Sequence, residues 1–190
     1  MSLQQTRLIM IIEVAIFTAL AIVLDNIPFL KFKIWANGGS VSLSMIPVFI
    51  VAFRWGLLGG LLSGSLFGIL KLLFGPTVLD FRHPLVDYTL ASTGLGLAGI
   101  FATKIKDAIT NNKNVMVFGY ITLGTLIGSL VRFLAHFYGG IVFFGHYAPE
   151  GQPVWLYSLL YNGSYMLPSF IICSIGIYLL FKANQRVLFR

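Results

Sequence analysis

The chain has 190 residues, of which 57% are hydrophobic and only 10% are charged. A typical soluble domain has roughly 25% charged residues, so this composition excludes an ordinary globular protein and indicates an integral membrane protein. The length suffices for about six spans of roughly 20 residues, which leaves no room for a soluble catalytic domain. We therefore expect an all-α membrane protein with a single domain, residues 1–190.

The basic residues and the cysteine count narrow the class further. The net charge of +7 comes from Lys and Arg dispersed at the ends of apolar runs, with no basic stripe that would favour nucleic acid. The single cysteine, Cys173, lies in an apolar run, so we expect neither a disulfide framework nor a cysteine-based metal site.

The first apolar run extends from Arg7 to Ile27. It is long enough to span a membrane and lacks the cleavage pattern of a signal peptide. Ala15 and Ala19 lie four residues apart within it, a spacing that lets another helix approach closely. Alanine is also a good helix former, so spacing alone leaves a packing surface and ordinary lipid exposure equally open.

A loop is expected from Pro28 to Ser40, followed by a short or broken helix over Val41–Phe53, which contains a proline and does not cross cleanly by itself. The next span, Trp55–Phe74, has glycines at four-residue spacing, a pattern that predicts tight packing in a bundle; they are Gly56, Gly60, Gly64 and Gly68. Lys71, near the end of this span, is expected to extend its amine toward the membrane interface.

After a loop from Gly75 to Leu85, a span is predicted over Val86–Thr103, and it begins with Asp87 and Tyr88. A carboxylate in the first turn is favoured by the helix dipole, which is the structural explanation for Asp87. The connector Lys104–Asn114 is basic and rich in asparagine, as cytoplasmic loops often are.

The fifth span starts near Val115 and the sixth covers Leu156–Phe181. At the end of the fifth span, Arg132 and His136 lie one helical turn apart, and an aromatic-rich loop follows. Ionisable groups at membrane depth are expensive, so they raise the hypothesis of a functional site. The alternatives are a structural pairing of Arg132, a hydrogen-bonded interior His136, and aromatics that form an interface belt.

Lys and Arg are divided unequally between the two sides of a six-span bundle. One side receives Arg7, Arg54, Lys104, Lys106, Lys113, Lys182, Arg186 and Arg190, and the other receives Lys31, Lys33 and Arg82. This bias places both termini in the cytoplasm. The same assignment sends Asp25, Asp87 and the aromatic loop Phe143–Trp155 outward, where rings and carboxylates would suit a flat, cationic small ligand.

Catalytic and nucleotide-binding motifs are absent from the sequence. It has no serine elbow, no HExxH, no Gly-rich phosphate loop and no Walker motif. We therefore expect no enzyme, no metal and no cofactor. A small intramembrane enzyme that uses His136 and Arg132 on a phosphorylated or lipid substrate is the alternative from another class.

Three stretches carry a resemblance to a known family: NGGSVSLSMIP at Asn37–Pro47, DYTLASTGLGLAG at Asp87–Gly99, and RFLAHFYGGIVFFGHYAPEGQPVWLYSLLYNGSYM at Arg132–Met166. Over essentially its full length the chain resembles the thiamine-specific S components (ThiT/YuaJ family) of energy-coupling factor (ECF) transporters. The resemblance implies a bacterial cell-membrane protein that captures thiamine, with uptake driven by a separate module of a transmembrane coupling subunit and two ATPases. Ala15 and Ala19 would contact the coupling subunit.

The resemblance also implies a set of ligand-binding residues. Asp87 and Tyr88 match the family's acidic residue and tyrosine, and Asp87 would hydrogen-bond the aminopyrimidine or offset the ligand's charge. His136 would lie beside the thiazolium. Phe144 would be the stacking aromatic, and Tyr157 and Asn162 would hydrogen-bond the ligand. Arg132 would be a supporting cation and Trp35 the first-loop tryptophan. Gly139 and Gly140 would allow close backbone approach.

Three of these positions depart from the residues of some family members. Asp87 stands where some have Glu, so ligand or backbone position must compensate for the shorter side chain. Phe144 stands where some have Trp, which weakens stacking, and Arg132 stands where some have Lys, which lacks the forked guanidinium. The nearer rival is an S component for a thiamine precursor or another flat vitamin.

Overall fold

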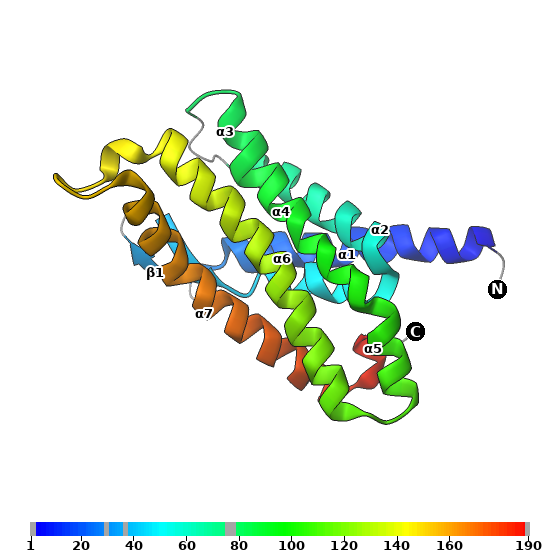
Figure 1. Ribbon diagram of the computed structural model, residues 1–190. Coiled ribbons are helices and arrows are strands. Elements are labelled where there is room, and N and C mark those ends of the chain that lie inside the picture. Colours follow the sequence, from blue (N-terminus) through cyan, green and yellow to red (C-terminus); the bar gives the residue numbers. More distant parts are fainter. Residues whose placement is uncertain (1–2, 29–30, 36–37, 75–78, 189–190) are drawn as a thin grey trace.

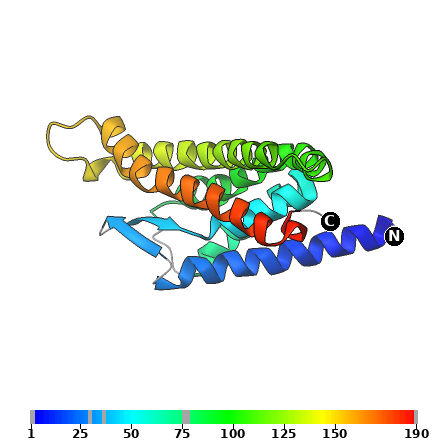
Figure 2. The same ribbon diagram turned by 90° about the horizontal axis from the view of Figure 1, so that it is seen from below.

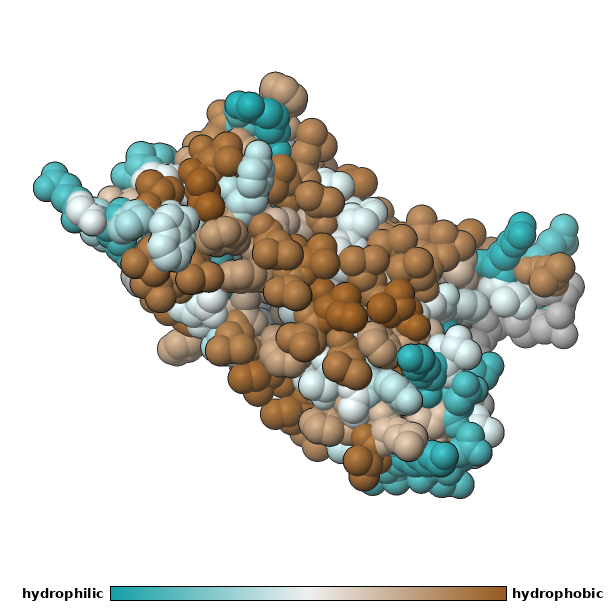
Figure 3. Space-filling view, in the orientation of Figure 1, coloured by the Kyte–Doolittle hydropathy of each residue, from teal (hydrophilic) through white to brown (hydrophobic). Residues whose placement is uncertain are grey.

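The computed structural model describes residues 3–28, 31–35, 38–74 and 79–188. Within these residues five helices are long and apolar enough to cross a membrane. They are α1 (Leu3–Asn26), α2 with the turn after it (Met45–Phe74), the segment Arg82–Thr110, α6 (Asn114–Phe143) and α7 (Val154–Ala183). Figure 1 shows them as one bundle. In Figure 3 hydrophobic residues cover the middle of the molecule and hydrophilic ones gather toward its ends, as expected of a membrane protein.

The stretch between α1 and α2 contains a β-hairpin where the sequence analysis expected only a loop from Pro28 to Ser40. Strand β1 (Lys31–Trp35) pairs antiparallel with β2 (Gly38–Ser42), with Lys31 opposite Ser42 and Trp35 opposite Gly38. β1 has aromatic and β-branched residues at alternate positions, a pattern that favours a strand. That alternation within five residues was the signal for the hairpin.

Helix α2 (Met45–Lys71) reverses direction at Gly56, whose φ of 72° and ψ of −162° are not helical. The helix therefore has two arms, and the neighbours of the first arm show its direction. Phe49 and Phe53 on the first arm lie beside Gly128 and Gly124 of α6, so this arm is antiparallel to α6. The positive φ favours glycine, because a side chain there would be strained. The expected short helix Val41–Phe53 and the span Trp55–Phe74 therefore correspond to two arms joined at Gly56.

The glycine ladder of the second α2 arm packs on the backbone of the segment Arg82–Thr110. A Cβ on Gly60 would lie 2.6 Å from the carbonyl oxygen of Gly96, and one on Gly64 would overlap the carbonyl oxygen of Ser92. Gly68 meets Tyr88 in the same way. The predicted tight packing is confirmed, and its consequence is that the two backbones touch along the whole arm.

The segment Arg82–Thr110 is continuous but irregular. It consists of α3 (Arg82–Pro84), a π-helical stretch η3 (Leu85–Leu90), α4 (Ala91–Thr93), a 3₁₀ stretch η4 (Gly94–Phe101) and α5 (Ala102–Thr110). The helical segment is therefore longer at both ends than the predicted span Val86–Thr103.

The start of this segment is fixed by Asp80. Its Oδ1 accepts hydrogen bonds from the backbone N–H groups of Arg82 (2.8 Å) and His83 (2.9 Å). These bonds lower the pKa of Asp80 below its usual value, and the bond from the His83 N–H contributes most to the shift. Because the helix begins at Arg82, Asp87 lies beyond the first turn, and the helix-dipole explanation for Asp87 is wrong.

At the opposite end, α1, the bend of α2 and the C-terminal tail are joined by one cluster. Glu13 accepts hydrogen bonds from Arg54 Nε and Trp55 Nε1, both at 2.7 Å. Arg54 also donates to the backbone carbonyls of Arg186 and Val187 near the turn η6 (Gln185–Val187). Figures 1 and 2 show both chain ends at this end of the bundle.

Substituting Gly64→Ala is expected to destabilise the protein, because the new Cβ overlaps the Ser92 carbonyl and forces the helices apart. Overpacking of this kind costs about 1–3 kcal/mol. The measurement is thermal unfolding of the purified variant in detergent. Gly119→Ala is the matched control, since a Cβ on Gly119 meets nothing within 4 Å. Equal stability of the two variants would contradict the packing role of the glycine ladder.

Candidate functional site

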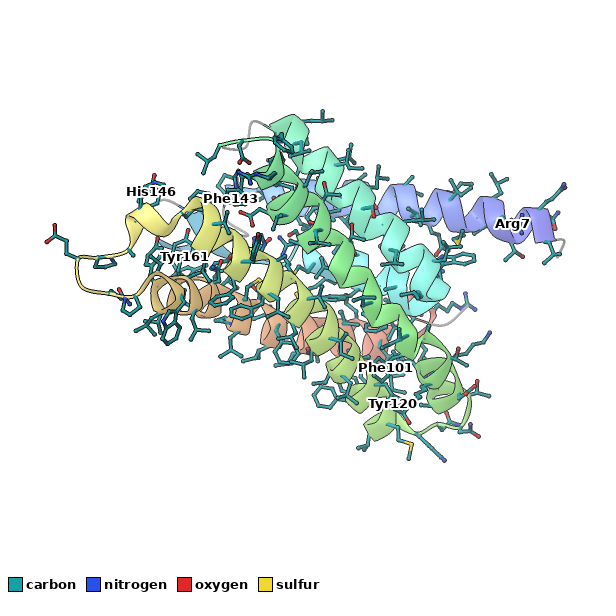
Figure 4. All side chains as sticks on the ribbon, turned by 45° about the horizontal axis from the view of Figure 1, so that its top comes forward. Arg7, Phe101, Tyr120, Phe143, His146 and Tyr161 are labelled. Atoms are coloured by element: carbon teal, nitrogen blue, oxygen red, sulfur yellow. The ribbon has the colours of Figure 1, made fainter. Side chains whose placement is uncertain are left out.

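A cavity of about 770 Å³ opens at the end of the bundle away from the chain termini. It is bounded by the last residues of α1, strand β2, both ends of α2, the start of the segment Arg82–Thr110, and the facing halves of α6 and α7. Figure 4 places the labelled Phe143, His146 and Tyr161 at this end, far from Phe101 and Tyr120. The volume is in the range of small-molecule sites.

The structure brings together nearly all the residues that the sequence analysis singled out for ligand binding. Those that line the cavity are Asp87, Tyr88, Arg132, His136, Gly140, Phe144, Tyr157 and Asn162. The exceptions are Gly139, which does not line the cavity, and Trp35, whose backbone belongs to β1 but whose side chain lies outside the described residues.

The Asp87 carboxylate lies between two histidines. Its Oδ2 is 3.0 Å from His83 Nε2, one turn earlier on the same helix, and its Oδ1 is 3.4 Å from His136 Nδ1 on α6. Oδ1 is buried and accepts no hydrogen bond from the residues that the structure describes. A buried carboxylate oxygen without a donor is costly, so this atom is poised to accept one from a ligand.

The glycines Gly139 and Gly140 allow these groups to lie against the α6 backbone. A Cβ on Gly139 would overlap Asp87 Oδ1, and one on Gly140 would overlap the Ser158 hydroxyl. Through this pair α6 contacts Asp87 on one side and α7 on the other. The expected close approach of a ligand to this backbone stays a prediction.

Aromatic rings form another part of the cavity wall. Phe144 stacks on Tyr147 with ring centroids 6.4 Å apart. On α7, Tyr157, Tyr161 and Tyr165 follow one another with centroid separations of 5.8 Å and 6.0 Å. Tyr161 and Tyr165 were not singled out from the sequence, although their four-residue spacing after Tyr157 places all three on one helical face.

Asn162 is held by several protein groups. Its Nδ2 donates to the backbone carbonyl of Ser158 at 2.9 Å, and its Oδ1 accepts from the Tyr165 hydroxyl at 2.6 Å. An amide oxygen has two lone pairs, so Oδ1 keeps one acceptor position. Asn162 is thus fixed in orientation and retains a single directional contact for a ligand.

Two cations line the cavity in different ways. Arg132 is buried and its Nη1 donates to Ser92 Oγ at 3.3 Å. Lys71 Nζ lies 3.2 Å from Asp25 Oδ2, and Ser44 Oγ donates to Asp25 Oδ1 at 3.1 Å. A carboxylate on the neighbouring helix therefore holds the Lys71 amine at the cavity. The expectation that Lys71 extends toward the membrane interface stays a prediction.

Ala15 and Ala19 lie on the exposed side of α1, away from the cavity. The opposite side of the helix is buried, and there Thr18 Oγ1 lies 2.9 Å from Ser63 Oγ on α2. The small-residue pair therefore faces outward, where a partner helix can reach it.

The chain is similar to known proteins over nearly its whole length. The family model described as thiamine transporter protein matches residues 11–189. The chain is 43% identical to the thiamine transporter ThiT of Bacillus subtilis over 97% of this chain and 96% of that protein. It is 33% identical to the ThiT of Lacticaseibacillus paracasei over 89% and 85%, respectively. A solved structure of ThiT from Listeria monocytogenes superposes with a TM-score of 0.90 at 29% identity, covering 97% of this chain and 100% of that one.

The Asp25–Lys71 pair gives a prediction for stability. Substituting Lys71→Met removes the cation and leaves Asp25 uncompensated beside the cavity. Breaking one partner of a buried pair costs roughly 3 kcal/mol, and the partial exposure of this pair lowers the figure to about 1–2 kcal/mol. Thermal unfolding in detergent measures it. The double variant Asp25→Asn/Lys71→Met should recover most of the loss, whereas additive losses would argue against a direct pair.

Proposed function

Because the chain belongs to the thiamine transporter family, we propose that it is the thiamine-capturing S component of an ECF transporter, a multi-pass bacterial membrane protein without enzymatic activity. The observation that carries the proposal is the cavity, in which Asp87 Oδ1 accepts no hydrogen bond from the described residues and aromatic rings line the wall. Thiamine offers both complements, since it combines a cationic thiazolium with an aminopyrimidine that donates hydrogen bonds.

The charges of the cavity favour Asp87 as the acid that receives the ligand. Asp25 is already compensated by Lys71 at 3.2 Å. Asp87 contacts histidines instead, and an uncharged histidine leaves the carboxylate its negative charge. A cation that enters the cavity therefore finds a carboxylate that forms no salt bridge with a lysine or arginine side chain among the described residues.

In this proposal each of the other lining residues contacts a different part of the ligand. Phe144 stacks on the pyrimidine and His136 lies beside the thiazolium. Tyr88, Tyr157 and Asn162 supply hydrogen bonds, Gly140 keeps the wall flat, and Trp35 is the candidate for the first-loop tryptophan that contacts the ligand. The bond from Arg132 to Ser92 supports a structural part for Arg132 behind the site.

We propose six membrane crossings with both termini in the cytoplasm. Gly56 reverses the chain within α2, so the five long helices contain six runs of alternating direction. Both chain ends lie together (Figure 2), as an even number of crossings requires. The excess of Lys and Arg at that end supports the cytoplasmic assignment, which sends the cavity outward.

The energy for uptake would come from an ECF module with a transmembrane coupling subunit and two ATPases. The outward position of Ala15 and Ala19 on α1 supports docking of the coupling subunit there. Small residues allow the close helix contact that holds membrane subunits together.

Substituting Asp87→Asn tests the ligand assignment. It removes the negative charge while keeping the size of the side chain, so thiamine affinity should fall roughly 10- to 100-fold, the effect of losing a hydrogen bond to a charged group. Isothermal titration of the purified protein measures it. Asp107→Asn is the matched control, an exposed acid on α5 far from the cavity. Equal affinities of the two variants would remove Asp87 from the site.

Substituting both Ala15→Leu and Ala19→Leu tests the docking surface. Bulkier side chains hold the coupling subunit away, so thiamine uptake by cells that express the variant with its module should fall at least about 10-fold. Thiamine binding to the purified variant should remain, because these residues lie away from the cavity. The control is Ala183→Leu, an exposed alanine at the end of α7. Normal uptake by the double variant would contradict docking through this pair.

A further inference from the structure

His83 is the most deeply buried titratable group at the cavity end, with 1% of its surface exposed. It follows the turn that Asp80 fixes and precedes Pro84, so its backbone position is determined on both sides. A buried histidine beside a binding site calls for an account of each ring nitrogen.

Both ring nitrogens of His83 have partners. The backbone N–H of Leu79 donates to Nδ1 at 3.5 Å, and Nε2 lies 3.0 Å from Asp87 Oδ2. A nitrogen that accepts from an N–H carries no proton, so the proton of the neutral ring is on Nε2 and points at the carboxylate. His83 is therefore an uncharged donor to Asp87.

The same ring also packs against the aromatic wall. Its centroid lies 5.1 Å from that of Phe144, 5.2 Å from that of Phe143 and 5.8 Å from that of Tyr88. One buried side chain thus contacts both the acid and the stacking ring of the candidate site. Moving it would disturb the two together.

We propose that His83 is the positioning residue of the thiamine site: it holds Asp87 by Oδ2 so that Oδ1 remains for the ligand, and it does so without neutralising the charge. The contrast with Asp25 supports this, because there a lysine holds the carboxylate and compensates it. The inference rests on the proposed function, and it gives the short side chain of Asp87 a fixed position against Gly139.

The test uses three variants of the full-length protein and isothermal titration with thiamine. His83→Leu removes the donor, and we expect affinity to fall roughly 10- to 100-fold. His83→Gln keeps an N–H that reaches the same oxygen, and we expect it to recover affinity to within about fivefold of the wild type. His146→Leu is the matched control, the same change at an exposed histidine.

A double-mutant cycle distinguishes positioning from a general effect on the fold. In the Asp87→Asn background, His83→Leu should add less than about threefold, because the group that it positions is already gone. Equal losses in both backgrounds, or no rescue by glutamine, would overturn the positioning role. If wild-type protein of intact fold bound no thiamine, the proposed function would fail and this inference with it, whereas wild-type binding unaffected by His83→Leu would overturn this inference alone.

Discussion

The Asp87 carboxylate, half-buried and with its Oδ1 atom buried, is the group on which the architecture of the cavity end depends. A carboxylate at this depth is tolerated only where hydrogen-bond donors surround it. The structure supplies His83 on Oδ2 and places His136 beside Oδ1. It also requires the absence of a side chain at Gly139, where a Cβ would overlap the acid. These neighbours leave one acceptor oxygen, Asp87 Oδ1, without a hydrogen bond at the wall of a cavity of small-molecule size.

The glycine packing of the bundle determines where that acid stands. The second arm of α2 touches the backbone of the segment that carries His83 and Asp87, with Gly68 against Tyr88 and Gly64 against Ser92. Ser92 in turn accepts the hydrogen bond from Arg132 on α6. Close packing of this kind holds the helices rigidly, so the site is built on fixed elements.

Most residues of the candidate site were expected from the resemblance to the thiamine-specific S components, and two of them also from their unusual position. Ionisable residues in an apolar helix are rare, and this drew attention to Arg132 and His136. The groups that the sequence missed depend on contacts between distant segments. The contact of Lys71 with Asp25 was missed because nothing in the sequence places the two side by side. The reversal at Gly56 was missed because this glycine also belongs to the four-residue glycine pattern that predicts helix packing. His83 was missed although its four-residue spacing to Asp87 was visible, because its loop was expected to extend to Leu85.

The most direct measurement of the central claim is the binding of thiamine to the purified wild-type chain in detergent, by isothermal titration after removal of any ligand that co-purifies. The account predicts saturable binding of one thiamine per chain, without ATP and without the ECF module. It also predicts that the ligand is released chemically unchanged, as mass spectrometry would show. Protein that keeps its helical fold but binds no thiamine, or that converts it, would contradict the account.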